Sequence, residues 1–283
     1  MVSFRKIKSA PRFLLYRGKQ IYHRAKYIPK MILLIKNWGL YVIDSFYLLG
    51  KRKRTFYFRN GLKITFITGT YDSFFVGEVF DESAYFDNNK NTLENVRTIV
   101  DLGAQIGIFS LFAAHKFPNA KIIAIEAGAE NYSLLEENIA QNNLEDRIMI
   151  LHRAVWSTSQ KPVTLAISKT HSGGHSVIKS SSNSEKEEVE TITLSEIMSS
   201  YNFTNFDLIK IDIEGAEYEV IYNAPKDVLR SISFVTMEAH EIDEEKNNPQ
   251  HLKKFLEANE FAVNLKDRFY LIARKLSNIR TDQ

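Results

Sequence analysis

The chain of 283 residues is long enough for one large domain with an appendage, and its composition, 44% hydrophobic and 25% charged, suits a globular protein with a full core. The absence of cysteine excludes disulfides, thiolate nucleophiles and cysteine-ligated zinc. Residues 1–54 hold 14 basic residues and one acid, Asp44, for a net charge of +13, whereas the rest of the chain holds 23 basic and 33 acidic residues. We therefore expect an acidic body with a basic N-terminal arm.

The basic arm, residues 1–54, is expected to be helical. It lacks the uninterrupted apolar core and the small-residue cleavage site of a signal peptide. Its most apolar window, 31–50, is interrupted by Lys36 and Asp44, which makes it a poor membrane span. Trp38, several tyrosines and the flanking basic residues suit either a helical appendage packed on the main domain or peripheral binding to an anionic membrane.

The arm is followed by signals of a β-hairpin and then of an α/β domain. Alternating apolar and polar residues around Asn60-Gly61 predict the hairpin, within a connecting region over 55–96. From residue 97 to 283, short apolar strands alternate with amphipathic helices, which is typical of a parallel sheet covered by helices on both faces. In the first half of this domain we expect strands over 97–103, 120–126 and 146–155, and helices over 107–118 and 130–143.

The second half of the domain continues the alternation after an interruption. Residues 168–188, rich in Ser, Gly and charge, predict a long loop that is either a mobile lid or a surface insertion. Two apolar runs within 261–274 predict an antiparallel hairpin at the edge of the sheet. Between these segments we expect buried strands over 206–217 and 231–240, and a helix over 248–260.

An acid and two glycines follow the first strand of the domain, in the sequence DLGAQIG. Ligands of open α/β sheets lie at the carboxyl ends of the strands, and Gly103 and Gly107 either let a ligand approach the backbone or serve only a tight turn. Asp101 favours a cationic ligand over a pyrophosphate, and no GxGxxG motif occurs. Glu126 ends the next strand, where a carboxylate can accept hydrogen bonds from a ribose diol. The set matches S-adenosylmethionine, which carries a sulfonium, an ammonium and a ribose diol.

A second group of charges surrounds the strand in LIKIDIEGAEYEVI. Packing alone does not explain so many charges at one buried strand end: Lys210, Asp212, Glu214 and Glu217. A purely structural alternative is an ion pair between Lys210 and Glu217 that stabilises the turn. Glu238 and His240 end the next strand two residues apart, on one side of it if the strand continues. His240 is either functional or a hydrogen-bonded core histidine.

These segments together resemble the FkbM family of S-adenosylmethionine-dependent methyltransferases, most clearly over residues 98–240. The stretches that carry the resemblance are VDLGAQIGIFSL, IIAIEAGAENYSLLEENI, RAVWS, VETITLSEI, LIKIDIEGAEYEVI and MEAH. It implies a class I, Rossmann-like methyltransferase fold, with a seven-stranded, mostly parallel sheet and an antiparallel last strand. Gln105 and Ala127 depart from the family's usual Asn and Pro, and both changes are conservative for cofactor binding. Residues 1–54 lie outside the resemblance.

The resemblance also implies site residues. The cofactor-binding set would be Asp101, Gly103, Gln105, Gly107, Glu126, Arg153 and Ala154, of which Glu126 would bind the ribose and the last two would border the adenine. A hydroxyl acceptor needs a general base or a metal ion that lowers its pKa. The catalytic candidates are Asp212, Glu214, Glu238 and His240, with Asp212 or His240 preferred as the base. In the metal version, Asp212 and Glu238 would hold a Mg²⁺ ion.

The function expected from this set is O-methylation of a hydroxyl, most often on a sugar, glycan, glycolipid or polyketide. Two alternatives stay open: an N-methyltransferase acting on nucleic acid or protein, and a catalytically inactive binding protein with this fold. The chain lacks the N/D-P-P-Y/F box of amino-methylating enzymes and an ordered aromatic RNA-binding motif, so a nucleic acid partner is not expected.

The remaining histidines and the cellular location complete the expectations. His171 and His175 lie in the predicted loop and are expected to be solvated rather than catalytic. His115 is expected at the polar edge of its helix. We expect a cytoplasmic protein, in which residues 1–54 either pack on the main domain or associate peripherally with a membrane.

Overall fold

The structure, a computed structural model, describes residues 21–83, 85–86, 93, 95–167, 176–177, 185–266 and 268–278. The chain forms two compact units, Met1–Asp81 and Glu82–Gln283. None of the helices within the described ranges is long and apolar enough to cross a membrane.

The N-terminal unit is a β-hairpin packed with short helices. Strands β1 (Lys53–Tyr57) and β2 (Lys63–Ile67) pair antiparallel, which confirms the predicted hairpin. The rings of Phe56 and Phe66 stack 4.1 Å apart and are fully buried. In place of one helical arm, the described part of this unit contains α2 (Ile28–Leu34), α3 (Trp38–Ser45) and α4 (Asp72–Asp81). The first two belong to the predicted arm, and α4 was not predicted.

A buried ion pair ties the helices of this unit to the chain that follows the hairpin. Asp44 is fully buried on α3, and its carboxylate accepts hydrogen bonds from the N–H of Gly69 and the hydroxyl of Ser73. The equally buried guanidinium of Arg24 lies 3.9 Å from this carboxylate and donates to the carbonyl oxygens of Asp44 and Thr70. Charges removed from water require such partners, so this cluster fixes how α3 packs.

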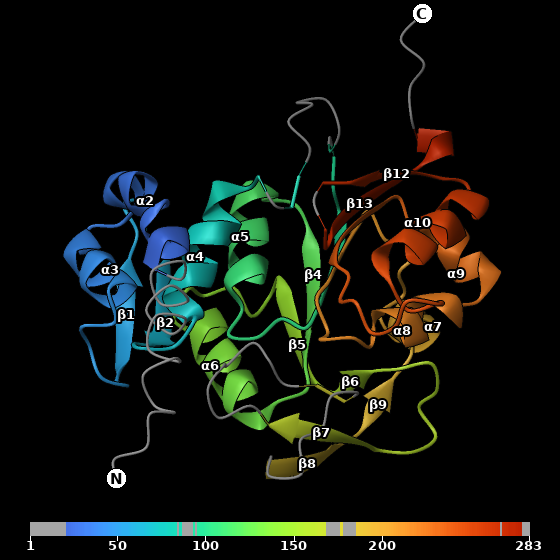
Figure 1. Ribbon diagram of the computed structural model, residues 1–283, viewed down its shortest axis with the longest axis horizontal. Coiled ribbons are helices and arrows are strands. Elements are labelled where there is room, and N and C mark those ends of the chain that lie inside the picture. Colours follow the sequence, from blue (N-terminus) through green and yellow to red (C-terminus); the bar gives the residue numbers. More distant parts are fainter. Residues whose placement is uncertain are drawn as a thin grey trace, which may run out of the picture. The chain divides into compact units, whose positions relative to one another are not determined.

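The C-terminal unit is built on a seven-stranded sheet (Figure 1). Its strand order is β12-β13-β11-β10-β3-β4-β5, and β13 runs antiparallel to both of its neighbours while the other adjacent pairs are parallel. This confirms the class I methyltransferase architecture with its antiparallel last strand. The strands are β3 (Thr98–Leu102), β4 (Lys121–Glu126), β5 (Ile148–His152), β10 (Leu208–Ile211), β11 (Phe234–Glu238), β12 (Phe261–Leu265) and β13 (Tyr270–Lys275).

Helices cover this sheet on both sides. In Figure 1, α5 (Ile108–Lys116) and α6 (Ala129–Ala140) lie on one side, and α7 to α10 lie on the other. The latter are α7 (Leu194–Ser200), α8 (Glu217–Tyr222), α9 (Lys226–Ser231) and α10 (Pro249–Ala258). The predicted helices correspond to α5, α6 and α10. Helices α7, α8 and α9 have only six or seven residues, too few turns for a periodic pattern.

The segment predicted as a loop over 168–188 is partly a β-hairpin. Strand β7 (Val163–Ile167) pairs antiparallel with β8 (Glu185–Val189), and Ser176 forms a bridge to Ala166. The loop prediction is therefore wrong over residues 185–188, because their charges belong to a largely exposed strand. The rest of the segment, with His171 and His175, lies outside the described residues except for 176–177. A second small pair, β6 (Ala154–Val155) with β9 (Thr191–Ile192), is parallel.

From β3 the sheet extends through β4 and β5 to one edge, and from β10 it extends through β11 toward the other edge. The switch point therefore lies between β3 and β10, and the residues that follow these two strands contact each other. Gly103 follows β3 with φ of +77°, and a Cβ added there would overlap the backbone carbonyl oxygen of Asp212, which follows β10. The Asp212 N–H in turn donates to the Leu102 carbonyl at 3.0 Å. Ligands of open α/β sheets bind at this switch point, so the contact lies where a site is expected.

Substitution of Asp44 by Ala should destabilise the N-terminal unit by about 3–5 kcal/mol, because it leaves the Arg24 charge buried and unpaired. Urea denaturation followed by circular dichroism measures this loss. The matched control is Asp81→Ala, which removes a half-exposed pair with Lys30 at 3.6 Å and should cost less than about 1 kcal/mol. Equal losses in the two variants would contradict the structural role of Asp44.

Substitution of Gly103 by Ala should destabilise the C-terminal unit by about 3 kcal/mol or more, because the positive φ and the overlap with Asp212 act together. The control is Gly61→Ala in the hairpin, where φ is +96° but nothing lies within 4 Å of the added Cβ. That variant carries only the backbone penalty, about 1–2 kcal/mol. Thermal or urea denaturation distinguishes them, and equal stabilities would show that the contact between the strand ends is dispensable.

Candidate functional site

A buried lysine holds the glycine turn after β3. The Lys210 ammonium donates to the Gly103 carbonyl at 2.7 Å and lies 3.2 Å from the carboxylate of Asp101, whose other oxygen accepts the Ser110 hydroxyl at 2.7 Å. Burial acts to lower the pKa of Lys210, but the charges of Asp101 and Asp212 outweigh it and raise this pKa. The alternative pairing of Lys210 with Glu217 is wrong.

Asp101 supports the turn from the protein interior. Its side chain is fully buried and is occupied by Lys210 and Ser110. Gly107, with φ of +88°, begins α5, and a Cβ there would lie 2.6 Å from the Leu135 side chain on α6. Both Gly103 and Gly107 therefore face atoms of the protein itself, and their first role is to shape the turn.

Glu126 ends β4 beside this turn. Its carboxylate accepts hydrogen bonds from the N–H of Gln105 at 2.9 Å, the N–H of Gly128 at 2.8 Å and the side-chain amide of Asn131 at 3.4 Å. Burial raises the pKa of Glu126, and the hydrogen bonds from Gly128 and Gln105 oppose that shift. A carboxylate offers about four lone-pair positions, so an anchored Glu126 keeps acceptor capacity for a diol.

The residues expected to border an adenine lie next to Glu126. The Arg153 N–H donates to the Glu126 carbonyl at 3.1 Å, and Ala154 is buried in β6. His152, which was not predicted as a site residue, lies directly beside Glu126 in the sheet and stacks on Tyr132 with ring centroids 5.0 Å apart. The sequence does contain a signal for this pair: Tyr132 lies on the helix after β4, and His152 ends the following strand, β5.

The structure brings the four catalytic candidates together, with Asp212, Glu214 and Glu238 close to His240. The Nε2 atom of His240 lies 3.5 Å from a carboxylate oxygen of Glu214 and 3.9 Å from one of Glu238. Asp212, Glu238 and His240 each offer one ligand atom within 4.8 Å of the others. Three such donors suit a divalent cation, and the set includes both residues of the predicted Mg²⁺ site.

Glu217 anchors this cluster from the protein interior. It is fully buried, and its Oε1 atom lies 3.0 Å from Nδ1 of His240. The same oxygen accepts the N–H groups of Ile213 and Gly215 at 3.2 Å each. Because a carboxylate only accepts, Nδ1 of His240 is the donor, and the ring is held with Nε2 toward Glu214 and Glu238. This orienting role of Glu217 was not predicted from the sequence.

The cluster attracts positive charge. Burial acts to lower the pKa of His240, but the hydrogen bond and charge of Glu217, followed by the charges of Asp212 and Glu214, raise it to about 9. His240 therefore carries a proton at neutral pH in this arrangement. Of the two bases considered, this favours Asp212 as the group that accepts a proton.

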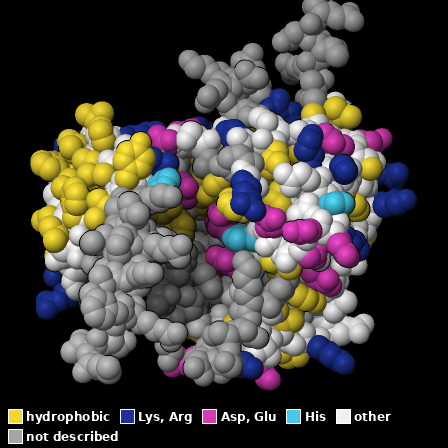
Figure 2. Space-filling model, in the orientation of Figure 1, with side chains coloured by type: hydrophobic (Ala, Val, Ile, Leu, Met, Phe, Trp, Pro, Cys, Tyr) yellow, Lys and Arg dark blue, Asp and Glu magenta, His cyan; other side chains and the backbone are white. Residues whose placement is uncertain are grey.

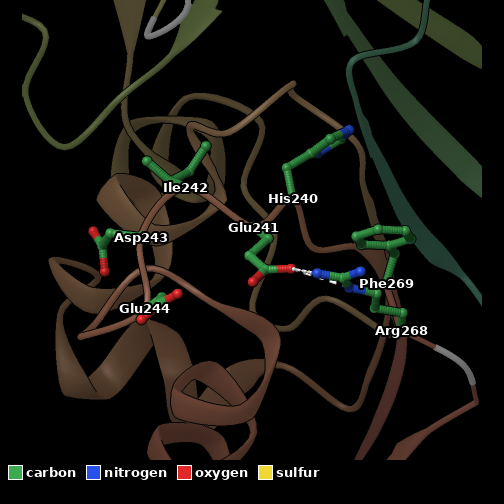
Figure 3. Close-up of a pocket in the computed structure, with 7 residues that line it drawn as sticks. All are labelled: His240, Glu241, Ile242, Asp243, Glu244, Arg268 and Phe269. Atoms are coloured by element: carbon green, nitrogen blue, oxygen red, sulfur yellow. Dashed lines mark hydrogen bonds and ion pairs between the residues drawn. The ribbon is translucent and has the colours of Figure 1, made fainter.

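A pocket of about 530 Å³ opens beside His240 (Figure 3). One wall comes from the segment after β11 and the other from the residues just before β13. The side chains of Glu241 and Arg268 point toward each other in Figure 3 and form an ion pair, with Nε of Arg268 3.1 Å from the Glu241 carboxylate. The lining residues are His240, Glu241, Ile242, Asp243, Glu244, Arg268 and Phe269.

Residues 101–263 match the family model described as the methyltransferase FkbM domain. The chain is 27% identical over 197 residues to methyltransferase sdnD of Sordaria araneosa, covering 59% of this chain and 74% of that protein. It is 22% identical over 223 residues to methyltransferase 1 of Beauveria bassiana, covering 71% and 82%. The structure of M. capricolum TrmK with S-adenosyl-homocysteine aligns with a TM-score of 0.39 and 11% identity, covering 71% of this chain and 66% of that chain.

The family match spans more than half of the chain and includes the turn after β3, Glu126 and the cluster around His240. The chain therefore belongs to the FkbM family of S-adenosylmethionine-dependent methyltransferases.

Proposed function

We propose that the protein is an O-methyltransferase that transfers the methyl group of S-adenosylmethionine to a hydroxyl of a sugar, glycan or glycolipid. The observation that carries the proposal is the contact between Gly103 and Asp212. It places the turn after β3 directly against the acidic cluster after β10 and β11. A methyl donor at the first and an acceptor at the second would be neighbours, as an in-line displacement requires.

The residues around the turn fit the cofactor. The Glu126 carboxylate offers acceptor capacity for the ribose diol, and the stacked rings of His152 and Tyr132 offer a flat edge for the adenine beside Arg153 and Ala154. Lys210 and Asp101, both buried, keep the turn in shape. When bound, the cofactor supplies the electrophilic methyl group.

Activation of the hydroxyl is assigned to the acidic cluster. An alcohol is a poor nucleophile at neutral pH, so its proton must pass to a nearby acceptor. We assign this role to Asp212, since it lies against Gly103 and His240 is already protonated. Asp212, Glu238 and His240 would also hold a divalent cation, which would displace the proton on Nε2 of His240 and, when bound, lower the pKa of the acceptor hydroxyl.

The chemistry of the pocket beside His240 supports a sugar-like acceptor. Sugar hydroxyls donate hydrogen bonds to carboxylates, and Glu241 and Glu244 line the pocket. The Phe269 ring offers an apolar face to the C–H groups of a sugar ring. Arg268 adds a donor for hydroxyl or ring oxygens.

Substitution of Glu126 by Ala should weaken binding of S-adenosylhomocysteine by about tenfold to a hundredfold, because two hydrogen bonds to a charged acceptor are lost. Isothermal titration calorimetry of wild type and variant measures this. Glu130→Ala, at an exposed acid on α6, is the matched control and should bind like wild type. A folded Glu126→Ala protein with unchanged affinity would exclude the assigned ribose contact.

Mn²⁺, used as a probe for the cation site, should bind the wild-type chain and bind Asp212→Asn or His240→Ala about tenfold more weakly or worse. The free Mn²⁺ signal in electron paramagnetic resonance reports the binding, and competition with Mg²⁺ tests the preferred ion. Glu244→Gln removes a nearby exposed acid outside the three donors and should bind Mn²⁺ normally. Equal binding by all variants would rule out this donor set.

A further inference from the structure

Exposed apolar side chains gather on one part of the N-terminal unit. Seven of the ten large apolar side chains that are exposed in the described ranges lie between residues 22 and 57. Figure 2 shows hydrophobic side chains gathered over α2 and α3. Such a gathering on a protein surface marks an interaction site. Its main members, here called the apolar patch, are Leu33, Trp38, Ile43, Phe46 and Leu48.

The apolar patch is the outward face of α3 with its flanks. Trp38 and Ile43 belong to α3, Phe46 directly follows its last residue, and all three side chains are exposed. The opposite face of the helix buries Tyr41, Asp44 and Ser45. The side chains of the patch therefore do not contribute to the core of this unit. Leu33 and Leu48, exposed by 73% and 72%, are the most exposed members of the apolar patch.

The exposed charges within residues 21–59, the segment that carries the apolar patch, all have one sign. Between residues 21 and 59 the only acid is Asp44, and it is fully buried with Arg24. The exposed charged residues in this range are basic and include Lys26, Lys36, the run 51–54 and Arg59. Residues 1–20 add six basic residues and no acid to the same arm. The apolar patch is thus set in a strongly cationic surface.

We propose that the apolar patch and its basic surroundings dock on an anionic lipid surface. The aliphatic and Phe side chains would enter the boundary between headgroups and acyl chains, with the Trp38 indole at the level of the headgroups. The lysines and arginines would meet lipid phosphates and carboxylates, each adding attraction at low salt. An anionic lipid surface attracts the basic residues around the patch. The patch of a second copy of the chain carries the same positive charge and would repel them, so we favour lipid as the partner. The proposal is independent of the methyl acceptor.

Co-sedimentation of the full chain with phosphatidylcholine vesicles, with and without phosphatidylserine, tests the proposal. Wild type should bind the vesicles that contain phosphatidylserine, and added salt should weaken binding. The variant Trp38→Ser/Phe46→Ser/Leu48→Ser should bind them about tenfold more weakly or worse. The control Met149→Ser/Leu276→Ser removes two exposed apolar side chains outside the patch and should bind like wild type.

Circular dichroism and thermal denaturation of the same variants show whether each remains folded, and this readout is separate from vesicle binding. The proposal is overturned if wild type stays in the supernatant with phosphatidylserine vesicles, or if the triple variant binds them as wild type does. It is also overturned if sedimentation velocity finds a dimer that the triple variant abolishes while vesicles do not bind, since the patch would then be an interface between copies.

Discussion

The buried ammonium of Lys210 holds together the part of the sheet on which the whole site depends. It reaches from β10 to the Asp101 carboxylate and the Gly103 carbonyl, so the two strands at the switch point are joined by charge as well as by backbone hydrogen bonds. A charge in this position is stable only with its partners. The same turn directs the Gln105 N–H to the Glu126 carboxylate and lies against the backbone carbonyl of Asp212.

A second buried charge organises the acceptor side in the same way. Glu217 fixes the ring of His240 and the turn that carries Glu214, and it does so from a fully buried position. In both halves of the site, a fully buried carboxylate thus supports the groups that face outward. In each half of the site, the buried carboxylate positions the neighbouring groups, and those groups are the ones placed to act on a ligand.

Much of the fold was predictable because long strands and helices have clear periodicity and the glycine turn has a recognisable sequence. The acids at the strand ends were identified for the same reason, since a parallel sheet gathers strand ends at one edge. Their partners were not predictable, because the pairing of Lys210 with Asp101 and of Glu217 with His240 depends on strand register and on which way each side chain points. Strand β8 was missed because the charges of an exposed strand resemble those of a loop, and α7 to α9 are too short to show a period.

The pocket beside His240 is made by two connections at the rim of the sheet, whereas the turn and the acidic cluster are locked to each other through Gly103 and Asp212. Sequence change can therefore act on the two parts unequally. Residues 241–244 and 268–269 can vary in size and charge without disturbing the strand ends, while a change at Gly103 or Asp212 alters both sides of the reaction at once. In a family built on this plan, substitutions in the pocket residues can change the acceptor that binds, while the residues of the methyl-transfer centre stay the same.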